Sequence, residues 1–168
     1  MSGINDTSNS HSITLVVTGS IAAYKSAELL RGLSKSGFHV RVAMTASATE
    51  FISPLTLQTL SGELVSTELF DLTSESEIGH IGLADEADLV LVAPATGNFI
   101  AKAALGLADD LASTILLAAT CPLVVAPALN VNMWNHAATR ANVDVLKGRG
   151  CHFVEPEEGE LACGWQGA

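Results

Sequence analysis

Basic residues are scarce in this chain of 168 residues. Eight Lys and Arg stand against eighteen Asp and Glu, which leaves a formal net charge of -10. Such a charge opposes nonspecific binding to a phosphate backbone or to an anionic bilayer. We therefore expect neither nucleic acid nor a membrane surface as a partner.

Cysteine is also sparse, with three residues and no CxxC spacing. The N-terminal stretch MSGINDTSNSHS is polar where a secretory signal needs an apolar core, and residues 1–12 are predicted to form a disordered tail. Both features predict a reducing, cytoplasmic location. No pair of histidines has metal-ligand spacing, so no metal site is expected.

Charged residues make up only 15% of the chain, and none occurs between Asp110 and Arg140. A membrane helix is excluded because Pro122 and Pro127 interrupt this span, leaving less than the roughly 20 apolar residues that a bilayer needs. The span instead predicts a helix over residues 109–119 and a buried strand over 123–126. A helix apolar on nearly all faces is covered on nearly all faces, and we expect a neighbouring subunit to provide that cover.

Apolar runs alternate with helical patterns along the remaining chain. The predicted strands cover residues 13–17, 38–44, 64–66, 89–93, 123–126 and 151–154. The first predicted helix ends near residue 36, and the others cover residues 46–51, 54–60, 97–104, 109–119 and 134–148. Continuous apolar strands indicate a sheet covered on both faces. The prediction is a single α/β domain, a doubly wound parallel sheet of Rossmann-like or flavodoxin-like type, over residues 13–168, with a flexible C-terminal flap over about 155–168.

Ligands of such sheets bind where the strands end. Gly19 and Ser20 follow the first strand at a helix start, which favours a phosphate, although the same pair is also an ordinary helix cap. The turn is not a GxGxxG fingerprint, and the second strand ends in Thr45 rather than in an acidic residue. This pattern favours a mononucleotide over a dinucleotide.

Two further residues are candidates for chemistry. Asn130 directly follows a buried strand, where its amide either reaches a ligand carboxylate or caps a helix that starts near Trp134; position alone favours neither. His80 lies in a segment that runs from a loop into a helix start, so it is a candidate for acid-base work or a surface or capping residue.

Several motifs occur together and in order: GSIAAYK at 19–25, GHIGLADEAD at 79–88, PATGN at 94–98, GLADDLASTILLA at 106–118, PALNVNMW at 127–134 and ACG at 162–164. In this combination the chain resembles the flavin-containing cysteine decarboxylases over about residues 13–167. It departs from their usual pattern at Gly97 and Leu129, where alanine and methionine are common.

The resemblance implies FMN as cofactor, bound between the subunits of a trimer that often assembles further into a dodecamer. It implies a phosphate site at Gly19, Ser20 and Thr45, and a flavin site lined by Ile21, Ala95, Thr96 and Asn98. It also implies His80, Asn130 and Cys163 as catalytic residues, with Asn130 and Met133 against the substrate.

The implied reaction is oxidation of an N-acylated cysteine side chain to a thioaldehyde, followed by loss of carbon dioxide to an enethiol. The first expected substrate is phosphopantothenoylcysteine, converted to phosphopantetheine in coenzyme A biosynthesis. The second is the C-terminal cysteine of a peptide in ribosomal natural-product biosynthesis. A noncatalytic flavin-binding regulator and a flavin prenyltransferase are more distant alternatives.

Overall fold

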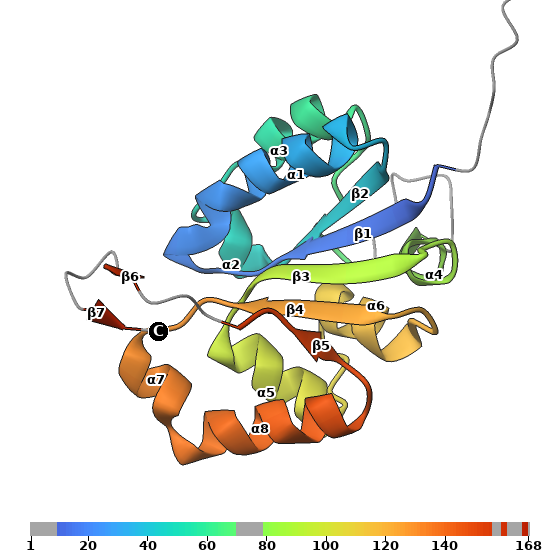
Figure 1. Cartoon of the computed structure of the whole chain (residues 1–168). Helices are drawn as coiled ribbons and strands as arrows, with labels where there is room; N and C mark the ends of the chain where they lie inside the picture. Colours follow the sequence, from blue (N-terminus) through green and yellow to red (C-terminus); the bar gives the residue numbers. More distant parts are fainter. Residues whose placement is uncertain (1–9, 70–78, 156–158, 161–165, 168) are drawn as a thin grey trace, which may run out of the picture.

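Five parallel strands form the central sheet of the computed structural model, which describes residues 10–69, 79–155, 159–160 and 166–167 (Figure 1). The strand order is β2-β1-β3-β4-β5. The strands are β1 (Ser12–Val17), β2 (His39–Met44), β3 (Leu89–Ala95), β4 (Leu123–Pro127) and β5 (His152–Phe153). Two short strands nearer the C-terminus, β6 (Gly159–Glu160) and β7 (Gln166–Gly167), pair antiparallel with each other.

Helices connect the strands and cover both faces of the sheet, with α1 and α3 above it and α5, α6 and α8 below it in Figure 1. In chain order they are the 3-10 helix η1 (Ile21–Tyr24), α1 (Lys25–Lys35), α2 (Ala46–Thr49), α3 (Pro54–Ser61), α4 (Gly79–Asp85), α5 (Gly97–Leu105), α6 (Leu111–Ala118), α7 (Val131–Asn135) and α8 (Ala137–Gly148). The predicted doubly wound parallel α/β fold of flavodoxin-like type is therefore confirmed.

Alternate residues of each central strand belong to two separate hydrophobic cores. Ile13, Leu15 and Val17 of β1 pack with Leu30 of α1 and Leu57 of α3 in one core. The other face of the sheet packs against α4, α5, α6 and α8 through a second set of buried residues, among them Val16, Val92, Phe99, Ile115 and Leu146. Because both faces are buried, the strands lack the polar alternation of a half-exposed sheet, as the sequence indicated.

The helix predicted over 134–148 is wrong in its extent. Two helices replace it, because His136 has an extended backbone, with φ of -61° and ψ of 136°. Its ring Nδ1 accepts a hydrogen bond from the Ala138 N–H at 3.1 Å and so caps the second helix. The first helix starts at Val131, directly after Asn130, instead of near Trp134.

The expected subunit cover for the uncharged helix is corrected in part. Within one chain α6 already buries Leu111, Ala112, Ser113, Ile115 and Leu116, mainly against α4 and α5. Of its large apolar side chains only Leu117 is exposed. The helix lacks charge chiefly because its own domain encloses it.

None of the helices in the described ranges is both long and apolar enough to span a bilayer.

Candidate functional site

Polar caps gather at the carboxyl edge of the sheet. Each of the first four strands is followed by a helix whose N-cap side chain accepts a hydrogen bond from that helix: Ser20 for η1, Thr45 for α2, Thr96 for α5 and Asn130 for α7. Since parallel strands end at a common edge, these caps share one end of the molecule. The strand-end positions selected from the sequence therefore lie at one site.

The centre of this edge lies between the ends of β1 and β3. These strands are neighbours, but the chain leaves β1 toward α1 on one face of the sheet and leaves β3 toward α5 on the other (Figure 1). A strand order of 2-1-3-4-5 has its topological switch point here, and ligands of open α/β sheets bind at such points.

The side of this edge formed by the ends of β1 and β2 is suited to a phosphate. A Cβ added to Gly19 would lie 2.3 Å from Cβ of Ser47, so only glycine permits the turn after β1 to approach the start of α2 this closely. The Ser20 Oγ accepts from the Ala22 N–H at 3.2 Å, and the Thr45 Oγ1 accepts from the Ala48 N–H at 3.2 Å. Each hydroxyl proton is left available for an anionic oxygen.

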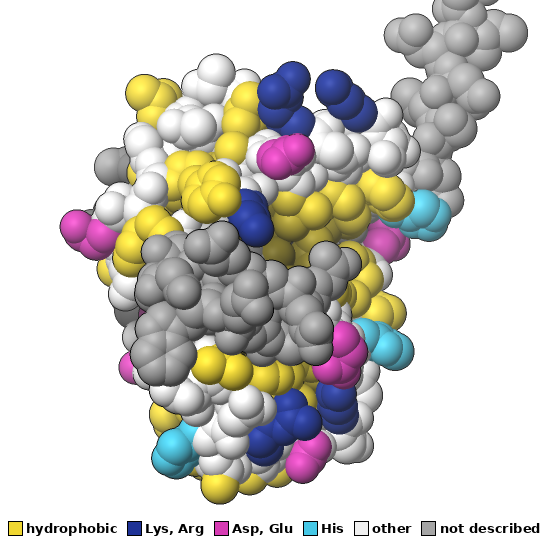
Figure 2. Space-filling view, turned by 60° about the vertical axis from the view of Figure 1, so that its left-hand side comes forward, with side chains coloured by type: hydrophobic (Ala, Val, Ile, Leu, Met, Phe, Trp, Pro, Cys, Tyr) yellow, Lys and Arg dark blue, Asp and Glu magenta, His cyan; other side chains and the backbone are white. Residues whose placement is uncertain are grey.

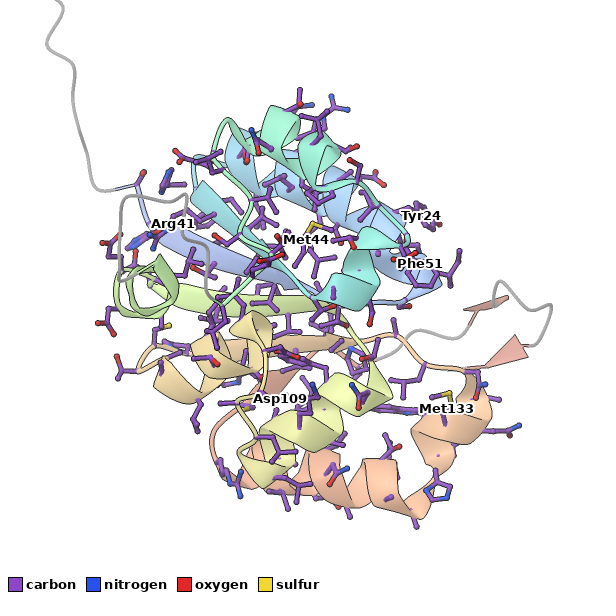
Figure 3. The ribbon with its side chains drawn as sticks, turned by 180° about the vertical axis from the view of Figure 1, so that it is seen from behind. Tyr24, Arg41, Met44, Phe51, Asp109 and Met133 are labelled. Carbon is purple, nitrogen blue, oxygen red and sulfur yellow. The ribbon has the colours of Figure 1, made fainter. Side chains whose placement is uncertain are left out.

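Large apolar side chains are exposed at the same edge. Ile21 is 59% exposed, Tyr24 61%, Phe51 48% and Met133 51%. Figure 3 shows Tyr24, Phe51 and Met133 at one end of the molecule and Arg41 at the other. Figure 2, which brings the left-hand side of Figure 1 forward, shows exposed hydrophobic side chains on that side. Helix caps with hydroxyl donors beside exposed apolar side chains suit a ligand that has an anionic end and an apolar ring.

Tyr24 and Phe51 were missed by sequence reasoning. Both follow strand-end caps by a few residues, Tyr24 after Ser20 and Phe51 after Thr45. Apolar residues in the first turns after such caps are a signal that could have found them.

Asn130 caps α7 by accepting the Met133 N–H at 2.8 Å through Oδ1. The capping alternative is thus observed, yet it leaves the other half of the amide unused. Within the described part of the chain Nδ2 makes no hydrogen bond. Because the cap fixes Oδ1 toward the helix, Nδ2 is presented as a donor, the polarity that a ligand carboxylate requires.

Of the residues expected against the flavin, two differ in what they expose. Ala95 is fully buried in the core, and its carbonyl accepts from the Ala128 N–H at 2.9 Å, whereas Asn98 in the first turn of α5 is exposed. The Thr96 Oγ1 accepts from the Phe99 N–H at 3.2 Å and starts that helix. The polar groups at this site are therefore backbone groups and uncharged helix-cap side chains rather than charged side chains.

His80 does not join this cluster within one chain. Its backbone lies in the first turn of α4, and its side chain is outside the described residues. Figure 1 shows α4 beside the amino ends of β1 and β3, and the Ser12 N–H donates to the Asp88 carboxylate just after this helix at 2.8 Å. The seven residues of β3 separate the two ends by roughly 20 Å. Cys163 also lies outside the described residues.

Metal ligation has no support among the described residues, where no group of three or more His, Cys, Asp or Glu side chains is placed to hold an ion. Burial raises the pKa of the Cys151 thiol above its ordinary value, and that of Cys121 as well. Both sulfurs are therefore protonated near neutral pH, and Cys151 is a small residue of the hydrophobic core.

Fold and edge together define a flavodoxin-like α/β protein with exposed apolar and aromatic side chains at the carboxyl edge of its sheet. Comparison with known families narrows this class: the Flavoprotein family matches residues 2–168, and the chain belongs to that family.

Similar proteins include bifunctional enzymes of coenzyme A biosynthesis. The chain is 50% identical over 159 residues to the Coenzyme A biosynthesis bifunctional protein CoaBC of Bacillus subtilis, covering 95% of this chain and 39% of that protein. It is 51% identical over 152 residues to the CoaBC protein of Escherichia coli K12, covering 90% and 37%. The chain thus spans about two fifths of the length of these relatives.

Solved structures share the fold. The FMN-dependent cysteine decarboxylase SpaF superposes with a TM-score of 0.83 at 34% identity, over 89% of this chain and 86% of that one. A Cys-to-Ser mutant of PPC decarboxylase, complexed with pantothenoylaminoethenethiol, gives 0.82 at 32% identity, over 95% and 89%.

Proposed function

We propose that this protein is an FMN-dependent decarboxylase of N-acylated cysteine, with phosphopantothenoylcysteine as its substrate and phosphopantetheine as its product. The observation that carries the proposal is the pairing of the glycine turn at Gly19, closely packed on α2, with the Asn130 amide, whose Nδ2 makes no hydrogen bond to the described residues. The identity of about 50% to CoaBC proteins supports the choice of substrate.

The proposed cofactor contacts are the strand-end residues that the family resemblance implies. Gly19, Ser20 and Thr45 hold the phosphate, while Ile21, Thr96 and Asn98 line the ring system and Ala95 lies buried beneath it. When bound, FMN supplies the hydride-accepting chemistry that amino-acid side chains lack.

The substrate contacts are proposed on α7. Asn130 donates from Nδ2 to the substrate carboxylate and so holds it in place for departure as carbon dioxide. Met133, one helical turn on, presents an exposed apolar side chain to the remainder of the substrate. His80 acts as the base near the thiol, and Cys163 returns a proton in the reductive half of the cycle.

A second copy of the chain completes the proposed site. His80 and Asn130 lie at opposite ends of the sheet in one chain, too far apart to act on one small substrate. If both act, the histidine comes from a neighbouring protomer, which agrees with the expected trimer. Assembly into a dodecamer and a cytoplasmic location remain predictions.

Mass spectrometry of the product tests the function. Purified protein loaded with FMN is incubated with phosphopantothenoylcysteine, and loss of carbon dioxide alone is the expected change. A product that has also lost two hydrogens means that the reaction stops at the enethiol. No change of mass contradicts the proposal.

The leading alternative is oxidative decarboxylation of a peptide C-terminal cysteine, which the structural similarity to SpaF keeps open. The same assay with short peptides that end in cysteine separates the two substrates. A noncatalytic flavin-binding regulator is the remaining alternative, and it predicts bound flavin with neither substrate changed.

Mixing two inactive variants tests the shared site. His80→Asn and Asn130→Asp each remove one part, and their mixed oligomers contain sites with both wild-type residues. We expect the mixture, unfolded and refolded together, to recover a measurable fraction of wild-type turnover. Lack of recovery in mixed oligomers confirmed by native mass spectrometry contradicts a site built from two copies.

A further inference from the structure

Thr18 directly follows β1 and is buried, with 1% of its surface exposed. Its hydroxyl is used twice. Oγ1 donates to the Pro94 carbonyl at 2.7 Å and accepts from the Thr96 N–H at 3.0 Å. The Thr18 N–H donates to the same Pro94 carbonyl at 3.2 Å.

These bonds cross the switch point of the sheet. Thr18 directly precedes the Gly19-Ser20 turn, whereas Pro94 and Thr96 flank Ala95 at the end of β3. The ladder between β1 and β3 extends only to the pair Val16 and Val92, so the Thr18 bonds continue the connection beyond the paired strands. One hydroxyl thereby links the proposed phosphate cradle to the proposed flavin-lining segment.

We propose that Thr18 is a positioning residue that sets the separation between these two parts of the FMN site. The inference rests on the proposed function, because it assumes that FMN occupies this edge. FMN contains its phosphate and its ring in one molecule, so it binds tightly only when both subsites are held at the matching separation. A hydroxyl that donates on one side and accepts on the other holds both segments, which a donor or an acceptor alone cannot do.

Ser26 of α1 provides a matched control. It is equally buried, with 2% exposed, and its Oγ donates to the Ala93 carbonyl at 3.1 Å. This bond anchors the same end of β3 but does not reach Thr96. A general loss of stability at this strand end is therefore expected from Ser26→Ala without a change in the separation of the subsites.

The experiment compares Thr18→Val, Thr18→Ser and Ser26→Ala in the full chain. Valine has nearly the shape of threonine but leaves the Thr96 N–H without its acceptor. The dissociation constants of FMN and of riboflavin, which lacks the phosphate, are measured by quenching of flavin fluorescence, and the stability of each apoprotein is measured by urea unfolding. If Thr18→Val is not recovered folded, Thr18→Cys, with a weakly hydrogen-bonding thiol, takes its place.

We expect Thr18→Val to weaken FMN binding by about tenfold or more, the effect of one unpaired N–H, and to weaken riboflavin binding less. The preference for FMN over riboflavin therefore shrinks. Thr18→Ser and Ser26→Ala should retain that preference. An unchanged FMN preference in Thr18→Val, or an equal loss in Ser26→Ala, overturns the positioning role. If the wild-type chain binds no FMN, the proposed function itself fails.

Discussion

Leu129 occupies the space that a side chain at Gly97 would need. A Cβ built on Gly97 lies 2.8 Å from Cδ2 of Leu129, closer than two carbon atoms can approach without displacement. Both positions are among the departures from the cysteine decarboxylase motifs that the sequence resembles. They lie in direct contact, one at the start of α5 beside Thr96 and the other directly before Asn130, so each departure accommodates the other.

This contact predicts a coupled effect on stability. Gly97→Ala alone should lower the free energy of unfolding by about 0.5–1.5 kcal/mol, the cost of moving the end of the flexible, partly exposed Leu129 side chain away from the added methyl. Leu129→Met, unbranched and flexible, should cost less than about 1.5 kcal/mol. Urea unfolding of the double variant should show less destabilisation than the sum of the single changes. Strict additivity would falsify the coupling.

Asn130 is predicted to have two separable roles. Asn130→Asp keeps an oxygen to accept the Met133 N–H, so α7 and the free energy of unfolding should change little. Decarboxylation should nevertheless fall by about a hundredfold or more, because the new carboxylate faces that of the substrate. Asn130→Ala should lose about 1 kcal/mol of stability as well. Product formation and urea unfolding are measured on both variants, and an active Asn130→Asp enzyme contradicts the donor role.

Alanine is predicted to be harmful at one glycine and favourable at another. Gly19→Ala places a Cβ 2.3 Å from that of Ser47, so the turn after β1 must move away from α2 and FMN binding should fall by at least about tenfold. Gly32→Ala in α1 meets nothing within 4 Å and should stabilise the fold by about 0.5–1 kcal/mol. Flavin titration and thermal unfolding check the pair. Equal FMN affinity in both variants would show that the Gly19 contact is unimportant.

Acid is predicted to weaken the start of α6 through Asp110. Burial alone would raise the pKa of this carboxyl, but hydrogen bonds from the Ser113 N–H, from Lys102 and from the Ser113 hydroxyl together outweigh burial, and its pKa lies below the ordinary value. The folded state therefore binds this proton less readily than the unfolded state. The resulting stability is present above the unfolded pKa of about 3.9 and is lost as the pH falls through the lower folded value.

Asp110→Asn tests this pH dependence, since asparagine still caps the helix without a charge. The free energy of unfolding, measured in urea between about pH 6 and pH 2.5, should fall less steeply in the variant than in the wild type. Asp109→Asn is the control, because Asp109 also contacts Lys102 at 2.7 Å but is mostly exposed and caps no helix. A steeper or identical slope in Asp110→Asn contradicts the prediction.

Local pattern was sufficient for the fold and for the strand-end positions that make up the candidate site. Continuous apolar strands between helices require cover on both faces, and the caps Ser20, Thr45, Thr96 and Asn130 are recognisable because each follows a strand directly. These features depend on residues close together in the chain.

Contacts between distant segments were decided only by tertiary packing. The bond from Thr18 to Thr96 joins residues 78 positions apart, and the fit of Leu129 against Gly97 depends on how α5 and α7 start beside one another. The cover of α6 by its own domain and the place of α4 at the far end of the sheet also arise from packing. Spacing along the chain determines which residues follow a strand, whereas the distances between them exist only once the sheet has brought its strands together.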